Sequence, residues 1–108
     1  MKTYCTLSDV NYLNQGKALF RSLAKASSED FVLYYLCLDQ DTYDYLIGYD
    51  ARIVPVFLSE VEKTSEKAQQ YKDTSRYEEY CWSLASTFSL FLLENYEIDS
   101  VMYMDSDL

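Results

Sequence analysis

The chain has 108 residues, a length that fits one small domain or a piece of a larger protein. A composition that is 49% hydrophobic, with 2 Gly and 1 Pro, argues against a disordered or fibrous chain. The net charge of −9 without any His argues against partners that are nucleic acids or anionic membrane surfaces. The same charge would repel a phosphate ligand unless a metal cation or local backbone donors compensate.

The first half of the chain alternates apolar runs with helical patterns. Residues 3–7 predict a strand, and residues 11–26 carry an apolar stripe at three- and four-residue spacing, which predicts a helix. Residues 31–38 are apolar on both faces, as in a central strand that helices cover on both sides. A short helix should follow, with Asp41 as its cap and Gly48 as its stop signal.

The next segment is less regular. Residues 51–57 predict a third strand, in which Pro55 favours an edge position or the end of the strand. A further short helix can open at residues 59–62. The polar and charged residues 63–75 suit a loop or a weak helix.

A long helix and a last strand complete the pattern. Thr74 or Ser75 is expected to cap the helix, which runs to about Tyr96, and the apolar residues 101–104 form the strand. Alternating strands and helices indicate parallel pairing. We therefore predict one α/β domain over residues 1–108, with a Rossmann-like, mostly parallel sheet of about four strands and flanking helices.

Three widely spaced cysteines, Cys5, Cys37 and Cys81, lie inside apolar strand or helix patterns. Their odd number does not suit a disulfide framework, so we expect buried free thiols, as in a reducing cytosol. The start of the chain has no apolar signal core, and no apolar stretch reaches the roughly 18 residues that span a membrane. These observations predict a cytoplasmic protein without a membrane span.

Asp105 and Asp107 stand one residue apart, directly after the predicted last strand. Ligands of parallel α/β sheets bind beyond the carboxyl ends of strands, and two carboxylates there can hold a hard divalent cation. That cation can hold a diphosphate, although two solvated acids explain the spacing equally well. Asp39 and Asp41 have the same spacing after the second strand, but a helical pattern follows them at once, which favours a helix cap.

The turn after the first strand lies at the same kind of place. Asp9 could accept a hydrogen bond from a ring N–H of a base, and Tyr12 could stack on that base. The alternative is that Asp9 or Asn11 caps the following helix and that Tyr12 packs inside. Before the long helix, Arg76 or Lys72 could reach a phosphate, although a solvated basic residue is the simpler interpretation of each.

Both ends of the chain resemble one family. The sequence TLSDVNY at 6–12, followed by GKALFRSL at 16–23, resembles the amino-terminal turn and helix of GT-A nucleotide-sugar glycosyltransferases. The nearest group is that of glycogenin and the bacterial lipopolysaccharide galactosyl- and glucosyltransferases. EYCWSL at 79–84 and VMYMDSDL at 101–108 resemble the helix and DxD strand of that fold. The likeness covers nearly the whole chain but only the first part of such an enzyme.

The resemblance implies roles for the candidate residues. Asp9 and Tyr12 would contact the base of a nucleotide-sugar donor, with Thr6 nearby. Asp105 and Asp107 would bind Mn²⁺ or Mg²⁺ and, through it, the diphosphate of the donor. The cation would stabilise the leaving nucleoside diphosphate, and the sugar would pass to an acceptor hydroxyl. The family pattern favours a UDP-sugar, leaves the acceptor unknown, and gives no catalytic side chain within this segment.

The chain also departs from the family pattern. Many relatives carry an Arg within the long helix, where this chain has CWS at 81–83, so Arg76 would be a displaced substitute. A His that often serves as a third metal ligand has no counterpart in the chain. We therefore expect the donor-binding half of a metal-dependent glycosyltransferase, weak or inactive alone. Its last strand would lie at an open edge, which favours self-association.

Two other interpretations stay open at this point. A receiver-like or flavodoxin-like α/β binding or signalling module fits the length, but Asp9 stands alone after the first strand. Residues 55–58 also offer no acceptor Asp after the third strand. A noncatalytic remnant that binds a partner protein is the remaining interpretation.

Overall fold

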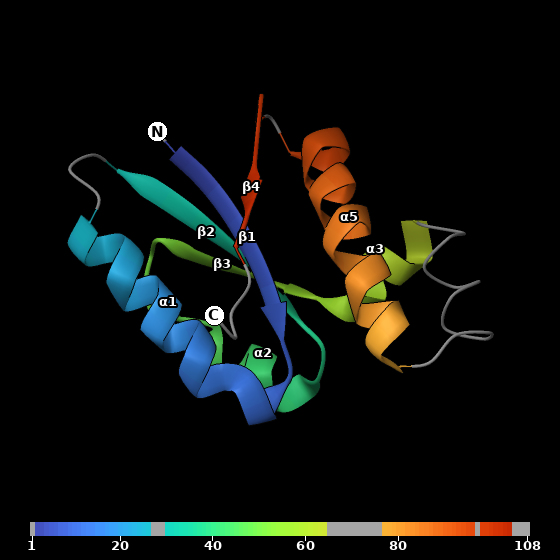
Figure 1. Ribbon diagram of the computed structural model, residues 1–108, viewed down its shortest axis with the longest axis horizontal. Helices are drawn as coiled ribbons and strands as arrows, with labels where there is room; N and C mark the ends of the chain where they lie inside the picture. Colours follow the sequence, from blue (N-terminus) through green and yellow to red (C-terminus); the bar gives the residue numbers. More distant parts are fainter. Residues whose placement is uncertain (1, 27–29, 65–76, 97, 105–108) are drawn as a thin grey trace.

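The computed structural model describes residues 2–26, 30–64, 77–96 and 98–104, with side chains except at 64 and 77–83. Its centre is a parallel sheet of four strands in the order β3-β2-β1-β4 (Figure 1). The strands are β1 (Lys2–Ser8), β2 (Phe31–Cys37), β3 (Ile53–Phe57) and β4 (Met102–Tyr103). The predicted α/β class and parallel, four-stranded sheet are confirmed.

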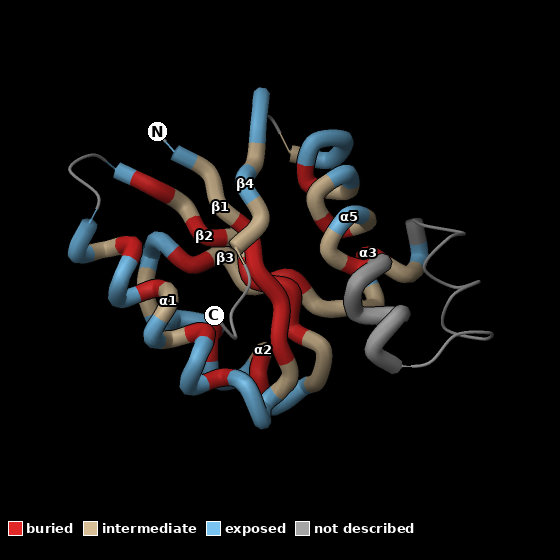
Figure 2. The backbone as a smooth tube through the Cα atoms, viewed as in Figure 1, coloured by how far each residue is buried: buried red, intermediate tan, exposed pale blue. Residues whose placement is uncertain are grey.

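Helices cover both faces of this sheet. They are the 3₁₀ helix η1 (Val10–Tyr12) and the α-helices α1 (Leu13–Ala26), α2 (Gln40–Leu46), α3 (Leu58–Thr64) and α5 (Tyr77–Asn95). One buried cluster joins α1 and α2 to the sheet, and a second joins α3 and α5 to its other face. Buried positions accordingly concentrate along β1, β2 and the inward sides of the helices (Figure 2).

The burial of β2 shows why its sequence is apolar throughout. Leu33 and Tyr35 belong to the cluster under α1 and α2, whereas Leu36 belongs to the cluster under α3 and α5. These three side chains are at most 1% exposed. Alternate residues of a strand point to opposite faces, so a strand covered on both sides needs apolar residues at every position.

The direction in which successive strands are added to the sheet reverses at β1. From β1 the chain proceeds to β2 and β3 on one side, and it returns to place β4 on the other side of β1. This is the 3-2-1-4 order of Rossmann-like sheets; in the flavodoxin-like order β1 lies between β2 and β3. The receiver- or flavodoxin-like interpretation therefore differs from the observed order of the strands.

One predicted helix cap is wrong. We expected Asp41 to cap the short helix, but Asp39 is the N-cap: it has extended backbone, and its side chain accepts from the N–H of Thr42. Capping oxygens bind the N–H two or three positions into the helix, which Asp39 reaches and Asp41 does not. Asp41 instead lies in the first turn, where its charge suits the helix dipole. Gly48, with φ of 76°, ends this region as predicted.

Other observed boundaries differ from the expected ones by a few residues, and some expected boundaries lie outside the described residues. The helix expected over 11–26 begins as η1 and becomes α-helical at Leu13. Pro55 lies on β3, which is an edge strand as its presence predicted. The segment from 65 to 76, including the expected caps Thr74 and Ser75, lies outside the described residues.

The last strand is at the other edge of the sheet. β4 pairs with β1, no further described strand pairs with it, and Met102 is 59% exposed. The expected edge position is confirmed, while self-association through that edge stays a prediction. No helix in the described ranges is both long and apolar enough to cross a membrane.

Two cysteines are buried free thiols, as expected. Cys5 and Cys37 lie in β1 and β2, and neither forms a disulfide. Burial, with a smaller contribution from the charge of Asp39, raises the pKa of Cys37 to about 12. The protonated thiol therefore prevails at neutral pH, and its low reactivity suits a packing role. The side chain of Cys81 lies outside the described part.

Close packing of α1 on the sheet depends on Gly16. This residue is buried over Tyr35, whose hydroxyl bonds Ser8 Oγ at 2.5 Å. A Cβ at position 16 would overlap the Tyr35 hydroxyl and come within 2.7 Å of its ring carbon Cζ. Glycine thus lets the helix approach the ring, and Tyr35 in turn joins β2 to the end of β1.

We predict that Gly16→Ala lowers the free energy of unfolding by about 1–3 kcal/mol, because steric overlap outweighs the higher helix propensity of Ala. Chemical denaturation measures the change. Gln15→Ala, at an exposed position of the same helix, is the control. Tyr35→Phe should recover part of the loss in the double variant because it removes the overlapping oxygen. A Gly16→Ala variant as stable as the parent would contradict the packing.

Candidate functional site

The candidate site is the carboxyl edge of the sheet, where β1 ends and toward which the neighbouring β4 runs. These strands are parallel neighbours: Cys5 pairs with Tyr103, and the N–H of Met104 donates to the carbonyl of Cys5 at 2.8 Å. After β1 the chain turns into α1 on one face, whereas α5, which precedes β4, covers the other face. Ligands of open α/β sheets bind at the carboxyl edge where strand order reverses in this way.

Asp9 shapes the turn that follows β1. Its Oδ1 accepts from the N–H of Asn11 at 3.0 Å, and its carbonyl accepts from the N–H of Tyr12 at 3.2 Å. Asp9 is thus the N-cap of η1, so the capping interpretation is confirmed for Asp9 and not for Asn11. Capping does not remove Asp9 from the edge, because it immediately follows the last residue of β1.

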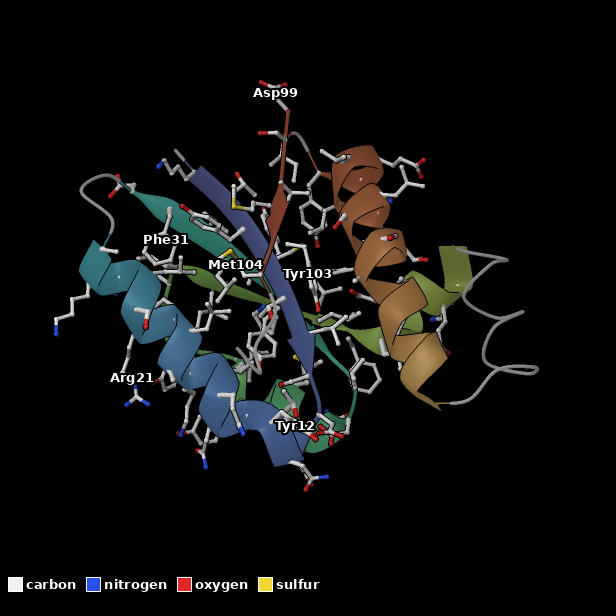
Figure 3. The ribbon with its side chains drawn as sticks, viewed as in Figure 1. Tyr12, Arg21, Phe31, Asp99, Tyr103 and Met104 are labelled. Atoms are coloured by element: carbon white, nitrogen blue, oxygen red, sulfur yellow. The ribbon has the colours of Figure 1, made fainter. Side chains whose placement is uncertain are left out.

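Tyr12 does not pack inside the described structure. Its side chain is 49% exposed, and Figure 3 shows it beyond the carboxyl end of β1. An exposed aromatic ring at this place could stack on a flat ligand. Of the two interpretations of Tyr12 that the sequence allows, the position of the ring favours a surface role over a packing role.

Asp39 binds the turn after β1 to the start of α2. Its Oδ2 accepts from the N–H of Val10 at 3.0 Å, while its Oδ1 accepts from the N–H and the hydroxyl of Thr42 at 3.0 and 2.5 Å. One carboxylate therefore joins segments 29 residues apart. Just before it, the N–H of Leu38 donates to the carbonyl of Ser8 at 3.1 Å and continues the pairing of the two strands.

These bonds also set the ionisation of Asp39. Burial acts to raise the pKa of its carboxyl, but the hydrogen bonds from the Thr42 hydroxyl and from the two amides outweigh burial and lower the pKa below 3.8. The ionised carboxylate is thus the form that the fold favours. Sequence reasoning took Asp39 for part of a capping pair and missed its contact with Val10.

Thr6 lies deeper than the turn. Its side chain is fully buried, and its hydroxyl has no hydrogen-bond partner among the residues that the structure describes. It occupies the register position opposite Tyr35 on β2. A contact between the hydroxyl of Thr6 and a nucleotide stays a prediction.

The expected metal and phosphate ligands come from four residues. Asp105, Asp107, Arg76 and Lys72 lie outside the described residues. β4 runs toward the edge in question, but its described pairing ends with Tyr103 opposite Cys5, before the end of β1 at Ser8. Within the described ranges, no group of three or more His, Cys, Asp or Glu could hold a metal ion. The metal site therefore stays a prediction from the sequence.

Comparison with known proteins finds a relative of similar sequence, whose name gives no function. The chain is 34% identical over 109 residues to a Bacillus subtilis (strain 168) protein known as "Uncharacterized protein YfnF". The match covers 97% of the chain but 34% of the relative, so the chain spans about a third of that protein's length. No family model and no solved structure matches the chain.

We predict that the contribution of Asp39 to stability depends on pH. Asp39→Ala should lower the free energy of unfolding by about 1–2 kcal/mol at pH 7, because the cap is lost. The native pKa lies below the ordinary 3.8, so the stabilisation is present above that value and is lost as the pH falls through the native pKa.

Urea unfolding of the parent and the variant from pH 7 down to about 2.5 measures this difference. Asp41→Ala, which changes the charge by the same amount in the first turn of α2, is the control. A loss of stability at Asp39 that stays constant across the range would contradict the role of the ionised carboxylate.

Proposed function

We propose that the chain is the donor-binding part of a metal-dependent glycosyltransferase that takes its sugar from a nucleotide-diphosphate donor. The observation that carries this proposal is the parallel pairing of β4 with β1 at the reversal of strand order, which points the carboxyl ends of both strands toward one edge. The Asp9–Tyr12 turn follows β1 there, and the sequence Asp105-Ser106-Asp107 follows the described end of β4. The resemblance of both segments to GT-A enzymes supports the same assignment.

Each part of this edge has a distinct task in the proposal. The exposed ring of Tyr12 stacks on the base, and a carboxylate oxygen of Asp9 accepts a hydrogen bond from a ring N–H of the base. Asp105 and Asp107 hold Mn²⁺ or Mg²⁺, a fit that rests on their carboxylate oxygens. The bound cation supplies Lewis-acid stabilisation of the departing nucleoside diphosphate. UDP is the favoured nucleotide.

The proposal assigns the remaining parts of the enzyme by comparison with the longer relative. Because the chain spans about a third of that protein, the residues that select the acceptor and complete the reaction are assigned to the rest of such a protein. The described residues therefore contribute binding and orientation of the donor. The sugar passes to an acceptor hydroxyl whose identity this part of the enzyme does not determine.

We predict that the chain binds UDP only when Mn²⁺ is present and that Asp107→Ala abolishes the binding. The carboxylate holds the cation, and without the cation the net charge of −9 repels the diphosphate. Calorimetric titration of UDP with Mn²⁺ and with a chelator measures the dependence. Asp99→Ala is the control, because Asp99 is an exposed acid beyond the opposite end of β4 (Figure 3). Metal-independent binding, or none by the parent chain, would reject the proposal.

We predict that Tyr12→Ala weakens UDP binding about tenfold, because the base loses its stacking partner. The free energy of unfolding should change by less than about 0.5 kcal/mol, since Tyr12 is about half exposed and belongs to neither buried cluster. Tyr45→Ala is the matched control: Tyr45 is 47% exposed, against 49% for Tyr12, and lies on α2. Equal effects of the two substitutions on UDP affinity would count against a base contact at Tyr12.

A further inference from the structure

The conformation of the Asp9–Tyr12 turn depends on a contact from another part of the chain. The turn holds a single turn of 3₁₀ helix, closed by the bond from the Tyr12 N–H to the Asp9 carbonyl and by the Asp9 cap. So short a helix has little stability of its own. The bond from the Val10 N–H to Asp39 Oδ2 attaches this turn to the β2–α2 loop.

We propose that Asp39 is a positioning residue that fixes the turn after β1 in the conformation in which Asp9 and Tyr12 meet the base. The identity of the ligand, a nucleotide, rests on the proposed function. The way in which Asp39 holds the turn rests on its own hydrogen bonds. Val10 lies between Asp9 and Tyr12, so a bond at its amide restrains the backbone on both sides. Asp39 does not contact the nucleotide in this scheme.

The two oxygens of Asp39 have separate tasks. Oδ2 accepts from Val10, and Oδ1 accepts from the amide and hydroxyl of Thr42 and thereby caps α2. Asparagine is as good an N-cap as aspartate. In Asp39→Asn the amide oxygen can keep the cap, while the side-chain NH₂ then faces the Val10 N–H, and two donors cannot bond. This substitution therefore removes the attachment of the turn and leaves α2 capped.

Amide hydrogen exchange followed by NMR on the nucleotide-free chain tests the attachment directly. In Asp39→Asn, exchange at Val10 should become at least about tenfold faster, while exchange at Thr42 stays close to that of the parent. Asp41→Asn is the control, because it removes the same charge two residues away, and both amides should keep their protection. Unchanged exchange at Val10, or equal loss of protection at both amides, would overturn the proposal.

Calorimetry with UDP and Mn²⁺ then tests the consequence. Asp39→Asn should weaken binding about tenfold, equivalent to about 1.4 kcal/mol, and Asp41→Asn should leave the affinity unchanged. Faster exchange at Val10 with full UDP affinity would overturn the positioning role. If the parent chain binds no UDP, the proposed function and the nucleotide role of Asp39 fall together, whereas the exchange result still decides whether Asp39 holds the turn.

Discussion

The pairing of β1 between β2 and β4 is the constraint on which the rest of the structure depends. Because both neighbours are parallel to β1, the three strands deliver their carboxyl ends to one edge. Seven register pairs hold β1 to β2, from Lys2 with Phe31 to Ser8 with Cys37, so the loops that follow these strands start side by side. That register brings Val10 within reach of Asp39, and the turn after β1 then takes its shape from both loops.

The buried clusters maintain this register from both faces. A slip of one residue would turn Leu33 and Tyr35 away from α1 and α2 and bring Leu36 under them, so each face would lose its packing. Gly16 adds a specific fit, since only glycine lets α1 approach the Tyr35 ring so closely. The edge that carries the candidate site is thus held in place by the packing of buried residues on both faces of the sheet.

Much of this fold follows from sequence patterns, but the site follows only in part. Apolar runs and helical spacing located the strands and the turn at Asp9, because these signals are local. The contact between Asp39 and Val10 was missed because it depends on the register of β1 with β2, which local patterns do not encode. The error at Asp41 has a similar cause: which of two nearby acids caps α2 depends on where β2 ends. The assignment of Asp105 and Asp107 as metal ligands stays a prediction from the sequence.

The hydrogen bonds at this edge give a physical reason why a phosphate ligand would need a cation. Phosphate-binding loops offer free backbone N–H groups, often at glycines. Here the amides of Val10, Asn11 and Thr42 donate to the carboxylates of Asp39 and Asp9. The two glycines are not part of the turn: Gly16 lies within α1, where it packs on Tyr35, and Gly48 follows α2. Because these three amides already donate to carboxylates, they are poor donors for a diphosphate, and a positive charge from another group would favour its binding. A divalent cation held by the acids that follow β4 would supply that charge at the reversal of strand order.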